Sequence, residues 1–414
     1  MKSSYSRYYF AWGILIFFYA YQYILRVVPG ILESELRNEL MLTASQFSTL
    51  GSYYMYSYGG AQIFLGLMVD RFGVRLIASL SLLLCIIGGV LFSESSNLIF
   101  LQLSRVMLGI GSGAALMSAL KIVADFFPEK SRGLFMGLSL SIGTLGVCLS
   151  GSNGVISFVE SMGWRWSVKL FALFGVIVLL LSALFLPTST KEKEKKSVLK
   201  HLPVLFKQKE IILYAILALS YYGSIVVLAD LWGTAYLMEK YQISRAQAVA
   251  SAMSMYVGAT FGSALIPFMF LNRKRFQSGL VLLSVIILIL FSGVSFLQDL
   301  SLTSTTVLLG VLGFFSGSVM LCFTGISYFT TSENSGLIIS CVNTFNMMGG
   351  AFLQQIIGGL LDHSWNGSYN SVGVRMYEAE QFSEVFGYLT SLFIVGVLVS
   401  TVLYFRSHPK AFES

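Results

Sequence analysis

The stretch ASQFSTLGSYYMYSYGG, residues 44–60, has a counterpart in RAQAVASAMSMYVGATFG, residues 245–262. Three shorter matches have nearly the same spacing, and they pair GIGSG from Gly109 with GFFSG from Gly313, Gly133-Leu134 with Gly336-Leu337, and Gly146 with Gly349. The offset stays between 201 and 204 residues, close to half of the 414-residue chain. A constant offset over four matches indicates an internal repeat, so we expect two copies of one structural unit.

The composition restricts the class of protein that this repeat builds. Apolar residues make up 55% of the chain, charged residues make up 11%, and the mean hydropathy is +0.75. A soluble chain carries roughly 25% charged residues, and one this apolar would expose large sticky patches to water. These values exclude a soluble enzyme, a disordered chain and a disulfide-stapled domain, and they leave an integral membrane protein. The 39 glycines and 6 prolines fit closely packed helices and not a β-barrel of ~10-residue alternating segments.

A helix that crosses a bilayer needs ~20 mostly apolar residues, and the chain contains twelve such runs. These runs are 8–29, 46–69, 76–94, 98–124, 133–158, 166–187, 211–236, 246–271, 278–297, 303–329, 336–361 and 383–405. We therefore expect an all-α integral membrane fold, with twelve transmembrane helices in two pseudo-symmetric six-helix bundles. Residues 1–187 are expected to form the N-terminal bundle and 211–414 the C-terminal bundle. Residues 188–210, which contain TKEKEKKSVLK, are expected to form a basic cytoplasmic linker.

The distribution of Lys and Arg predicts the orientation of these helices. With the N-terminus placed in the cytoplasm, eighteen of the 27 basic residues fall in inner loops and tails and six fall in outer loops. Because inner loops carry the excess of basic residues, we expect both termini to be cytoplasmic. The net charge of +7 then reflects topology and does not indicate a nucleic-acid partner, while the basic linker is expected to meet anionic membrane lipid. The first apolar run has no signal-peptide cleavage site, so we expect it to be retained as a span.

The sequence GLMVDRFGVR begins at Gly66, at the expected cytoplasmic end of the second span. It resembles the inner-loop signature of the major facilitator superfamily. The matching positions are Gly66, Asp70, Arg71, Gly73 and Arg75. Met68 and Val74 depart from that signature.

The resemblance implies that this loop acts as a gate. A glycine at position 66 would let the second span approach its partner helix closely. In the family, an acid at the place of Asp70 meets the N-terminus of the eleventh span, where the helix dipole favours an anion. Lys121 and Asp125 lie four residues apart near the inner end of the fourth span, and they form either part of this gate or an ordinary interfacial pair. The second-half counterpart, FLNRKRF from Phe270, lacks the acid.

The sequence SRVMLGIGSGAA, from Ser104 in the fourth span, resembles the family's second signature, an intramembrane arginine followed by small residues. Here these residues are Arg105, Gly109, Gly111 and Gly113. In the family this arginine supports conformational coupling or proton transfer, and the alternative is a structural role in packing against the first span. The sequences DFFPEKSRG from Asp125 and GWRW from Gly163 also resemble the family, so the resemblance covers the whole chain.

Two segments resemble particular branches of the family. YQYILRVVPGILESEL from Tyr21 and LADLWGTAYLMEKYQIS from Leu228 resemble the bacterial phagosomal-transporter branch, whose members import amino acids. The first segment also resembles the anion:cation symporter branch, in which an Asp-Arg pair occupies this place and the arginine holds a substrate carboxylate. Here Leu25 precedes Arg26, so the acid of that pair is missing. The resemblance implies a carrier of the bacterial inner membrane that works as a monomer.

Charged residues inside the spans are the main site candidates, because each costs ~2.5–3.5 kcal/mol at mid-membrane. Arg26 is either a fork that binds a substrate carboxylate or an arginine that snorkels to the outer interface. Asp230 is the only carboxylate deep within a span, and the repeat places it at a depth similar to that of Arg26. Asp230 takes the coupling proton, binds a substrate ammonium group or forms a structural salt bridge with Arg26. Glu33 is a candidate outer-gate partner of Arg26, and the candidates for proton coupling are Asp230, Arg105 and Glu33.

A substrate cavity also needs polar and aromatic walls. The side chains available within the spans are Tyr19, Tyr23, Tyr54, Tyr58, Gln62, Tyr221, Tyr222, Trp232, Asn343, Asn346 and Gln354. Tyr54 and Tyr58 lie one helical turn apart on one face, a spacing that serves packing as well as substrate contact.

The chain lacks the residue patterns of an enzyme. The expected spans contain no histidine, no metal-ligand cluster and no nucleophile–base pair, so we expect no cofactor and no metal. Neither an enzyme nor a receptor needs charges at matching depth in two repeats. We therefore expect a secondary active transporter that works by alternating access and moves a small zwitterionic or anionic solute inward with a proton. The solute is an amino acid, a short peptide or an organic acid, and a siderophore carrier or drug exporter of the same fold is the alternative.

Overall fold

The computed structural model describes residues 2–151, 153–188, 208–270, 273–297, 299–329 and 335–407. The chain divides into two compact units, Met1–Lys196 and Ser197–Ser414. Within the described residues the regular elements are helices, and the β-structure is one isolated bridge between Tyr369 and Arg375. Most of the expected linker 188–210 lies outside the described residues.

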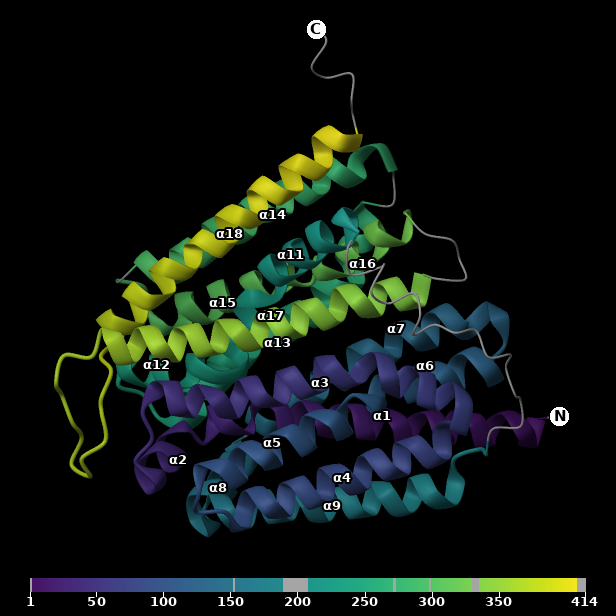
Figure 1. The fold of residues 1–414 in the computed structure, drawn as a ribbon, viewed down its shortest axis with the longest axis horizontal. Coiled ribbons are helices and arrows are strands. Elements are labelled where there is room, and N and C mark those ends of the chain that lie inside the picture. Colours follow the sequence, from purple (N-terminus) through teal and green to yellow (C-terminus); the bar gives the residue numbers. More distant parts are fainter. Residues whose placement is uncertain are drawn as a thin grey trace, which may run out of the picture. The chain divides into compact units, whose positions relative to one another are not determined.

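Unit 1 consists of helices joined by short connections (Figure 1). Its elements are α1 (Lys2–Ile31), α2 (Glu33–Leu40), α3 (Ala44–Phe72), α4 (Val74–Glu94), α5 (Leu98–Ser112), α6 (Ala114–Phe126), α7 (Glu129–Leu145), the 3-10 helix η1 (Gly146–Gly151), α8 (Asn153–Met162) and α9 (Trp164–Phe185). Helix α3 packs along α5, and α4 packs against both α5 and α9. Helix α1 contacts α6, α7 and α9, so it runs through the centre of the unit.

Unit 2 repeats this construction. Its elements are α11 (Lys209–Ser224), the π-helix η2 (Ile225–Trp232), α12 (Gly233–Tyr241), α13 (Arg245–Met269), α14 (Arg273–Phe296), α15 (Leu302–Ser316), α16 (Val319–Ser327), α17 (Ser335–His363) and α18 (Ala379–Ser407). Helix α13 packs along α15, α14 along α18 and α11 along α17.

The all-α membrane fold expected from the sequence is confirmed. Eleven helices of the described residues are long and apolar enough to cross a membrane. Helix α3, with 29 residues, has the length of a spanning helix but is more polar, because tyrosines and serines crowd its middle. Each of the twelve expected spans corresponds to one helix or to consecutive helical segments. The short helix α2 was not expected as a separate element.

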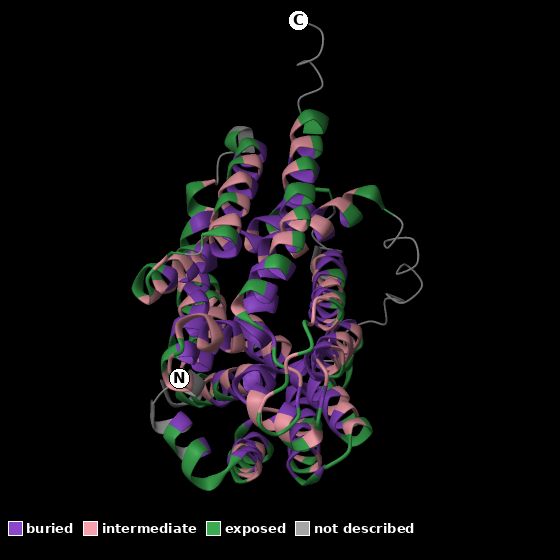
Figure 2. Cartoon of the chain, turned by 90° about the vertical axis from the view of Figure 1, so that its left-hand side faces the viewer, coloured by how far each residue is buried: buried purple, intermediate pink, exposed green. Residues whose placement is uncertain are grey.

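Exposed and buried residues lie on different faces of the same helices (Figure 2). Helix α9 exposes a stripe of large apolar side chains at three- and four-residue intervals, which are Trp166, Leu170, Leu173, Ile177, Leu180 and Leu184. Such a stripe is costly in water and favourable in a hydrocarbon environment. The unit therefore turns apolar faces outwards, as a protein inside a bilayer must.

The caps of two equivalent helices show the repeat at atomic detail. Thr43 and Gln46 form a capping box at the start of α3, and Ser244 and Gln247 form one at the start of α13. The residues just before these boxes, Met41 and Gln242, both have left-handed backbone, with φ of 53° and 50°. A capping box satisfies two otherwise unpaired helix N–H groups, and the same device recurs 201 residues later.

Glycines allow the closest helix contacts in both units. A Cβ atom added to Gly109 of α5 would overlap Ser57 and the carbonyl of Tyr54 in α3. In unit 2, a Cβ atom added to Gly262 of α13 would overlap the backbone of Phe314 in α15. Small residues at such crossings let helix backbones approach, which is a main source of helix association in membranes.

We predict that Gly262→Ala destabilises unit 2, because the Phe314 backbone cannot move away as a flexible side chain would. Overpacking of this kind costs typically 1–3 kcal/mol, more than the helix propensity gained by replacing glycine with alanine. The melting temperature of the detergent-purified protein measures the effect. Gly60→Ala in α3 is the matched control, because a Cβ atom there meets nothing within 4 Å. Equal melting temperatures for the two variants would contradict the close contact.

Candidate functional site

The polar centre of unit 1 begins on α1, where Tyr19, Tyr23 and Arg26 follow one another at turn spacing. The Arg26 guanidinium carbon lies 5.9 Å from the centroid of the Tyr23 ring. The Tyr19 and Tyr23 hydroxyl oxygens lie 3.3 Å apart, and their rings meet edge to face. Arg26 is only 7% exposed. A desolvated cation beside an aromatic face is stabilised by the ring quadrupole.

Helix α3 adds two more tyrosines to this centre. The rings of Tyr54 and Tyr58 stack with centroids 6.1 Å apart, as expected for residues one turn apart. The Tyr54 hydroxyl donates a hydrogen bond of 2.8 Å to the side-chain oxygen of Gln22 on α1. The residue Gln22 was not singled out from the sequence, where it stands between two tyrosines. We call Tyr19, Tyr23, Arg26, Tyr54 and Tyr58 the tyrosine–arginine cluster.

Arg105 of α5 joins this cluster to the backbone of α1. Its three guanidinium nitrogens donate to the carbonyls of Leu50 at 2.6 Å, Leu25 at 2.7 Å and Arg26 at 3.2 Å. The carbonyl of Leu25 would normally accept from the N–H four residues later, but that residue is Pro29, which has none. Arg105 therefore supplies the donor that the proline removes. This geometry favours the structural role in packing on the first span that the sequence left as one alternative.

The polar centre of unit 2 lies on the π-helix η2, which carries Asp230. Asp230 is 2% exposed and accepts a hydrogen bond from the hydroxyl of Tyr256 on α13. A π-helix is rare, and short π segments inside α-helices occur frequently at functional sites. Neither this segment nor Tyr256 was foreseen. The repeat could have identified Tyr256, because Tyr256 lies 202 residues after Tyr54, in the equivalent helix.

The other expected cavity residues of unit 2 lie in different surroundings. Tyr221 is buried, and its hydroxyl donates to the carbonyl of Leu280 on α14 at 2.6 Å, so it faces a neighbouring helix instead of a substrate. Tyr222 and Asn343 are half-buried. The ring of Trp232 packs 5.9 Å from that of Phe382 on α18.

Two amides of α17 are buried. The side-chain oxygen of Asn346 has no hydrogen-bond partner among the described residues. Gln354 donates from its side-chain nitrogen to the carbonyl of Val226 in η2, at 3.1 Å. Gln62 of α3, the remaining amide of the expected cavity wall, is also buried.

The expected outer end of unit 1 carries a second set of charges. Leu32 separates α1 from α2, and Glu33 pairs with Arg37 inside α2 at 2.6 Å. The helix thus does not carry Glu33 along the face of Arg26 as a continuous helix would. Glu39 of α2 accepts hydrogen bonds from Arg165 and from Trp164. Partial burial raises the pKa of Glu39, but these hydrogen bonds outweigh it and hold the pKa below its usual value.

The signature loop near Gly66 forms an ion-pair network within unit 1. The Lys121 ammonium lies 2.8 Å from Asp70 and 3.2 Å from Asp125, so the expected i,i+4 pair is present and Asp70 joins it. A Cβ atom at Gly66 would meet nothing within 4 Å, and the expected close approach of the second span to its partner helix stays a prediction. Gly66 lies on the open side of α3.

The remaining signature residues have local roles. Arg75 donates to the carbonyls of Leu184 and Leu186, at the C-terminal end of α9, where a cation also meets the negative end of the helix dipole. Gly73 has a φ of 86°, so it provides the left-handed turn between α3 and α4. Arg71 is exposed and lies over the ring of Phe72.

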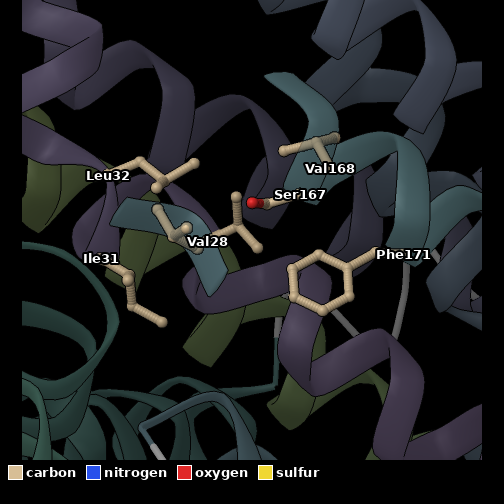
Figure 3. A pocket seen from close by; sticks show the side chains of 7 residues that line it. Val28, Ile31, Leu32, Ser167, Val168 and Phe171 are labelled. Carbon is tan, nitrogen blue, oxygen red and sulfur yellow. The ribbon is translucent and has the colours of Figure 1, made fainter. Parts of the chain in front are cut away.

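A small pocket lies beside the C-terminal end of α1 (Figure 3). Its walls come from α1, α8 and α9, and they are Val28, Ile31, Leu32, Val159, Ser167, Val168 and Phe171. Ser167 provides the only polar side chain, so this pocket is not suited to bind an anion. Among the described residues, no group of three or more His, Cys, Asp or Glu side chains is placed to hold a metal ion.

Two repeated helical units with lipid-facing apolar stripes and buried charges define a polytopic membrane transport protein. The sequence pattern of the Major Facilitator Superfamily matches residues 8–354, and the chain belongs to that family.

Several relatives are named as transporters of acidic solutes. The chain is 29% identical over 167 residues to a probable sulfoacetate transporter of Cupriavidus necator, a match that covers 40% of this chain and 38% of the relative. It is 32% identical over 170 residues to a probable L-galactonate transporter of Escherichia coli, covering 40% and 36%. A hexuronate transporter of Bacillus subtilis is 25% identical over 305 residues and covers 69% and 70%. The first two matches thus span little more than a third of those relatives.

The fold agrees with solved structures of the family. A bacterial homologue of the human lysosomal transporter Spinster, in an inward-facing and occupied conformation, superimposes with a TM-score of 0.74. The match covers 94% of this chain and 95% of that chain at 16% sequence identity. The unoccupied form of that homologue gives a TM-score of 0.71. These similarities concern the fold alone.

We predict that Arg105→Lys slows active uptake at least about tenfold, because a lysine keeps the charge but loses the planar fork that reaches three carbonyls. Uptake into proteoliposomes and binding of the same solute measure the two effects, and binding is expected to change much less. Pro29→Ala gives the Leu25 carbonyl its ordinary donor and is expected to recover part of the melting temperature that Arg105→Lys loses. Normal uptake by Arg105→Gln would show that the fork is dispensable.

We predict that Asp70→Asn slows transport but leaves folding nearly unchanged. Asp70 is about half exposed, so its ion pair with Lys121 contributes at most about 1 kcal/mol. Reactivity of single cysteines with a membrane-impermeant reagent, tested from each side, measures the change in gating. Asp125→Asn is the matched control, because it removes the other carboxylate of Lys121. Identical effects of the two changes would mean that Asp70 has no gating role beyond pairing with Lys121.

Proposed function

We propose that this protein is a secondary active importer of a small organic anion, which it moves by alternating access together with a proton. The anionic group of the solute is bound by Arg26 within the tyrosine–arginine cluster. The observation that carries this proposal is the burial of Arg26 among tyrosines in the C-terminal part of an apolar spanning helix.

The chemistry of Arg26 supports an anionic solute. A guanidinium presents paired donors that match a carboxylate or a sulfonate, and such charge-assisted bonds are strong when water is excluded. The tyrosines contribute hydroxyl groups and flat ring faces around it. The names of three relatives point in the same direction, since sulfoacetate, galactonate and hexuronate are all organic acids. Among the expected solutes, an organic acid is therefore favoured over an amino acid or a short peptide.

Asp230 is the proposed proton carrier. It is a buried carboxylate on an irregular helical segment, and a carboxylate is a group that can take up and release a proton. There are two alternatives for Asp230. It binds an ammonium group of the solute, which would mean that the solute is zwitterionic, or it forms a structural salt bridge with Arg26. Arg105 and Glu33 are less suited to carry the proton, because both have close partners within unit 1.

The cellular setting is also part of the proposal. The excess of Lys and Arg in the expected inner loops supports cytoplasmic termini. We place the protein as a monomer in the bacterial inner membrane, with its basic linker near anionic lipid. Loss of Lys191, Lys193, Lys195 and Lys196 would then reduce binding of the purified protein to acidic lipid vesicles.

The direct experiment is uptake into proteoliposomes with an imposed pH gradient. The panel contains sugar acids, sulfonated carboxylates, amino acids, dipeptides, a siderophore and cationic dyes. Accumulation of one acid class, driven by an inward proton gradient, is the expected result. Uptake of amino acids alone would show that the solute is zwitterionic. Extrusion of dyes would show that the protein is a drug exporter, and it would contradict the proposal.

We predict that Arg26→Ala lowers the affinity for the transported acid roughly 10- to 150-fold, since it removes a desolvated charge-assisted contact of about 1.5–3 kcal/mol. Titration of the purified protein with the acid measures this loss. Arg406→Ala, at the exposed end of α18, is the control and is expected to bind normally. Unchanged affinity in Arg26→Ala would move the anion site elsewhere.

We predict that Asp230→Asn still exchanges labelled for unlabelled solute but no longer accumulates it against a gradient. The amide keeps the shape of the side chain and cannot carry a proton. Loss of exchange as well would assign Asp230 to solute binding. Recovery of transport in the double variant Arg26→Gln, Asp230→Asn would indicate a structural pair, because neither partner then leaves a lone buried charge.

A further inference from the structure

The two units share an irregular feature in their first spanning helix. The carbonyl of Leu25 in α1 accepts from Arg105, and the carbonyl of Val226 in the π-helix η2 accepts from Gln354. These two carbonyls are 201 residues apart, the same offset that relates the capping boxes of α3 and α13. At equivalent points of the repeat, therefore, a side chain from another helix binds a backbone carbonyl where the helix departs from regular α geometry.

The causes of the two irregularities differ. In unit 1 the residue at position 29 is a proline, which has no N–H. The missing donor is therefore a consequence of the covalent structure. In unit 2 no proline stands in η2, and the wider π turn has poorer geometry than an α turn. Relaxation of η2 to an α-helix would change the register by one residue and rotate part of the helix by ~100°. Asp230 would then turn away from the Tyr256 hydroxyl that now donates to it.

Gly233 follows the last residue of the π-helix η2. A Cβ atom at that position would overlap the carbonyl of Leu228. The π-helix is thus followed by a residue without a side chain. Contacts that stabilise its geometry come from neighbouring helices. Helix α17 packs against η2, and Gln354 of α17 donates a hydrogen bond to the carbonyl of Val226 in it.

The surroundings of Gln354 argue against a role in stability alone. Its side chain is 1% exposed, and its bond to a carbonyl requires the nitrogen to face Val226. Its amide oxygen has no hydrogen-bond partner among the described residues. A buried acceptor without a donor is unfavourable, and an apolar side chain of similar size would avoid it. The glutamine thus binds Val226 through its nitrogen while its own oxygen stays unsatisfied.

We propose that Gln354 is a positioning residue, which holds η2 in its π register and thereby keeps Asp230 directed at Tyr256. It is the second-unit counterpart of Arg105, supplied by α17 instead of α5. The proposal rests on the proposed role of Asp230 in transport. Gln354 itself contacts neither the solute nor the proton in this scheme.

The test compares Gln354→Leu with Asp230→Asn and with the double variant, using exchange and gradient-driven accumulation in the same proteoliposomes. Gln277→Leu is the matched control, because Gln277 of α14 is also buried, also donates one hydrogen bond, to Tyr214, and also has an unpartnered oxygen among the described residues. We expect Gln354→Leu to lower accumulation at least about tenfold, to lower exchange less than about threefold, and to melt no lower than Gln277→Leu.

The double variant provides the decisive result. Asp230→Asn is expected to abolish accumulation, so exchange is the activity that is compared in the double variant. If Gln354 acts through Asp230, adding Gln354→Leu to Asp230→Asn causes no further loss of exchange, since coupled residues are non-additive. Gln354→Met keeps a side chain of similar length but has no hydrogen-bond donor, and it is expected to behave like Gln354→Leu. Additive losses, or normal accumulation by Gln354→Leu, would overturn the inference. Normal accumulation by Asp230→Asn would instead refute the proposed function, so the two failures are distinguishable.

Faster hydrogen–deuterium exchange of residues 225–232 in Gln354→Leu than in Gln277→Leu is the expected structural signature, because π-helical bonds lose their external support. Equal exchange of this segment in the two variants would also overturn the inference.

Discussion

A backbone carbonyl inside a bilayer has no water to bind, so each one that a helix releases needs a donor from the protein. This requirement governs the first spanning helix of both units. Arg105 of α5 serves the carbonyl that Pro29 leaves open in α1, and Gln354 of α17 serves Val226 in the π-helix η2. Because both donors belong to other helices, each irregular turn is attached to its neighbour. Arg26 and Asp230 stand next to these turns, so their directions depend on the same attachments.

The rest of each unit provides a rigid frame for these turns. Glycines such as Gly109 and Gly262 bring helix backbones into direct contact, and a membrane protein relies on such packing because lipid is as apolar as its side chains. The exposed apolar stripe of α9 faces away from the helix contacts inside the unit. Among the described residues, the charged side chains lie mainly in two places, the centres of the units and the ends of the helices. This separation is what a solute pathway through an apolar protein requires.

The two units are alike in construction and different in chemistry. Unit 1 presents a cation among tyrosines, whereas unit 2 presents a carboxylate held by one tyrosine. Membership of the Major Facilitator Superfamily explains the common construction. The chemical difference supports the proposed cargo, an organic acid that moves with a proton. Tyr54 and Tyr256 occupy corresponding places in these contrasting centres, so the same scaffold position supports either charge.

The sequence alone determined the helical class, the repeat, the spans to within a few residues, and local pairs such as Lys121–Asp125 and Tyr54–Tyr58. These features depend on apolar run length and on the 3.6-residue turn, which are properties of neighbouring residues. The tertiary structure alone decided that η2 is a π-helix and that Tyr221 faces α14. Helix register and side-chain direction at such points follow from donors on distant helices, and a residue's own neighbours in the chain do not specify those contacts.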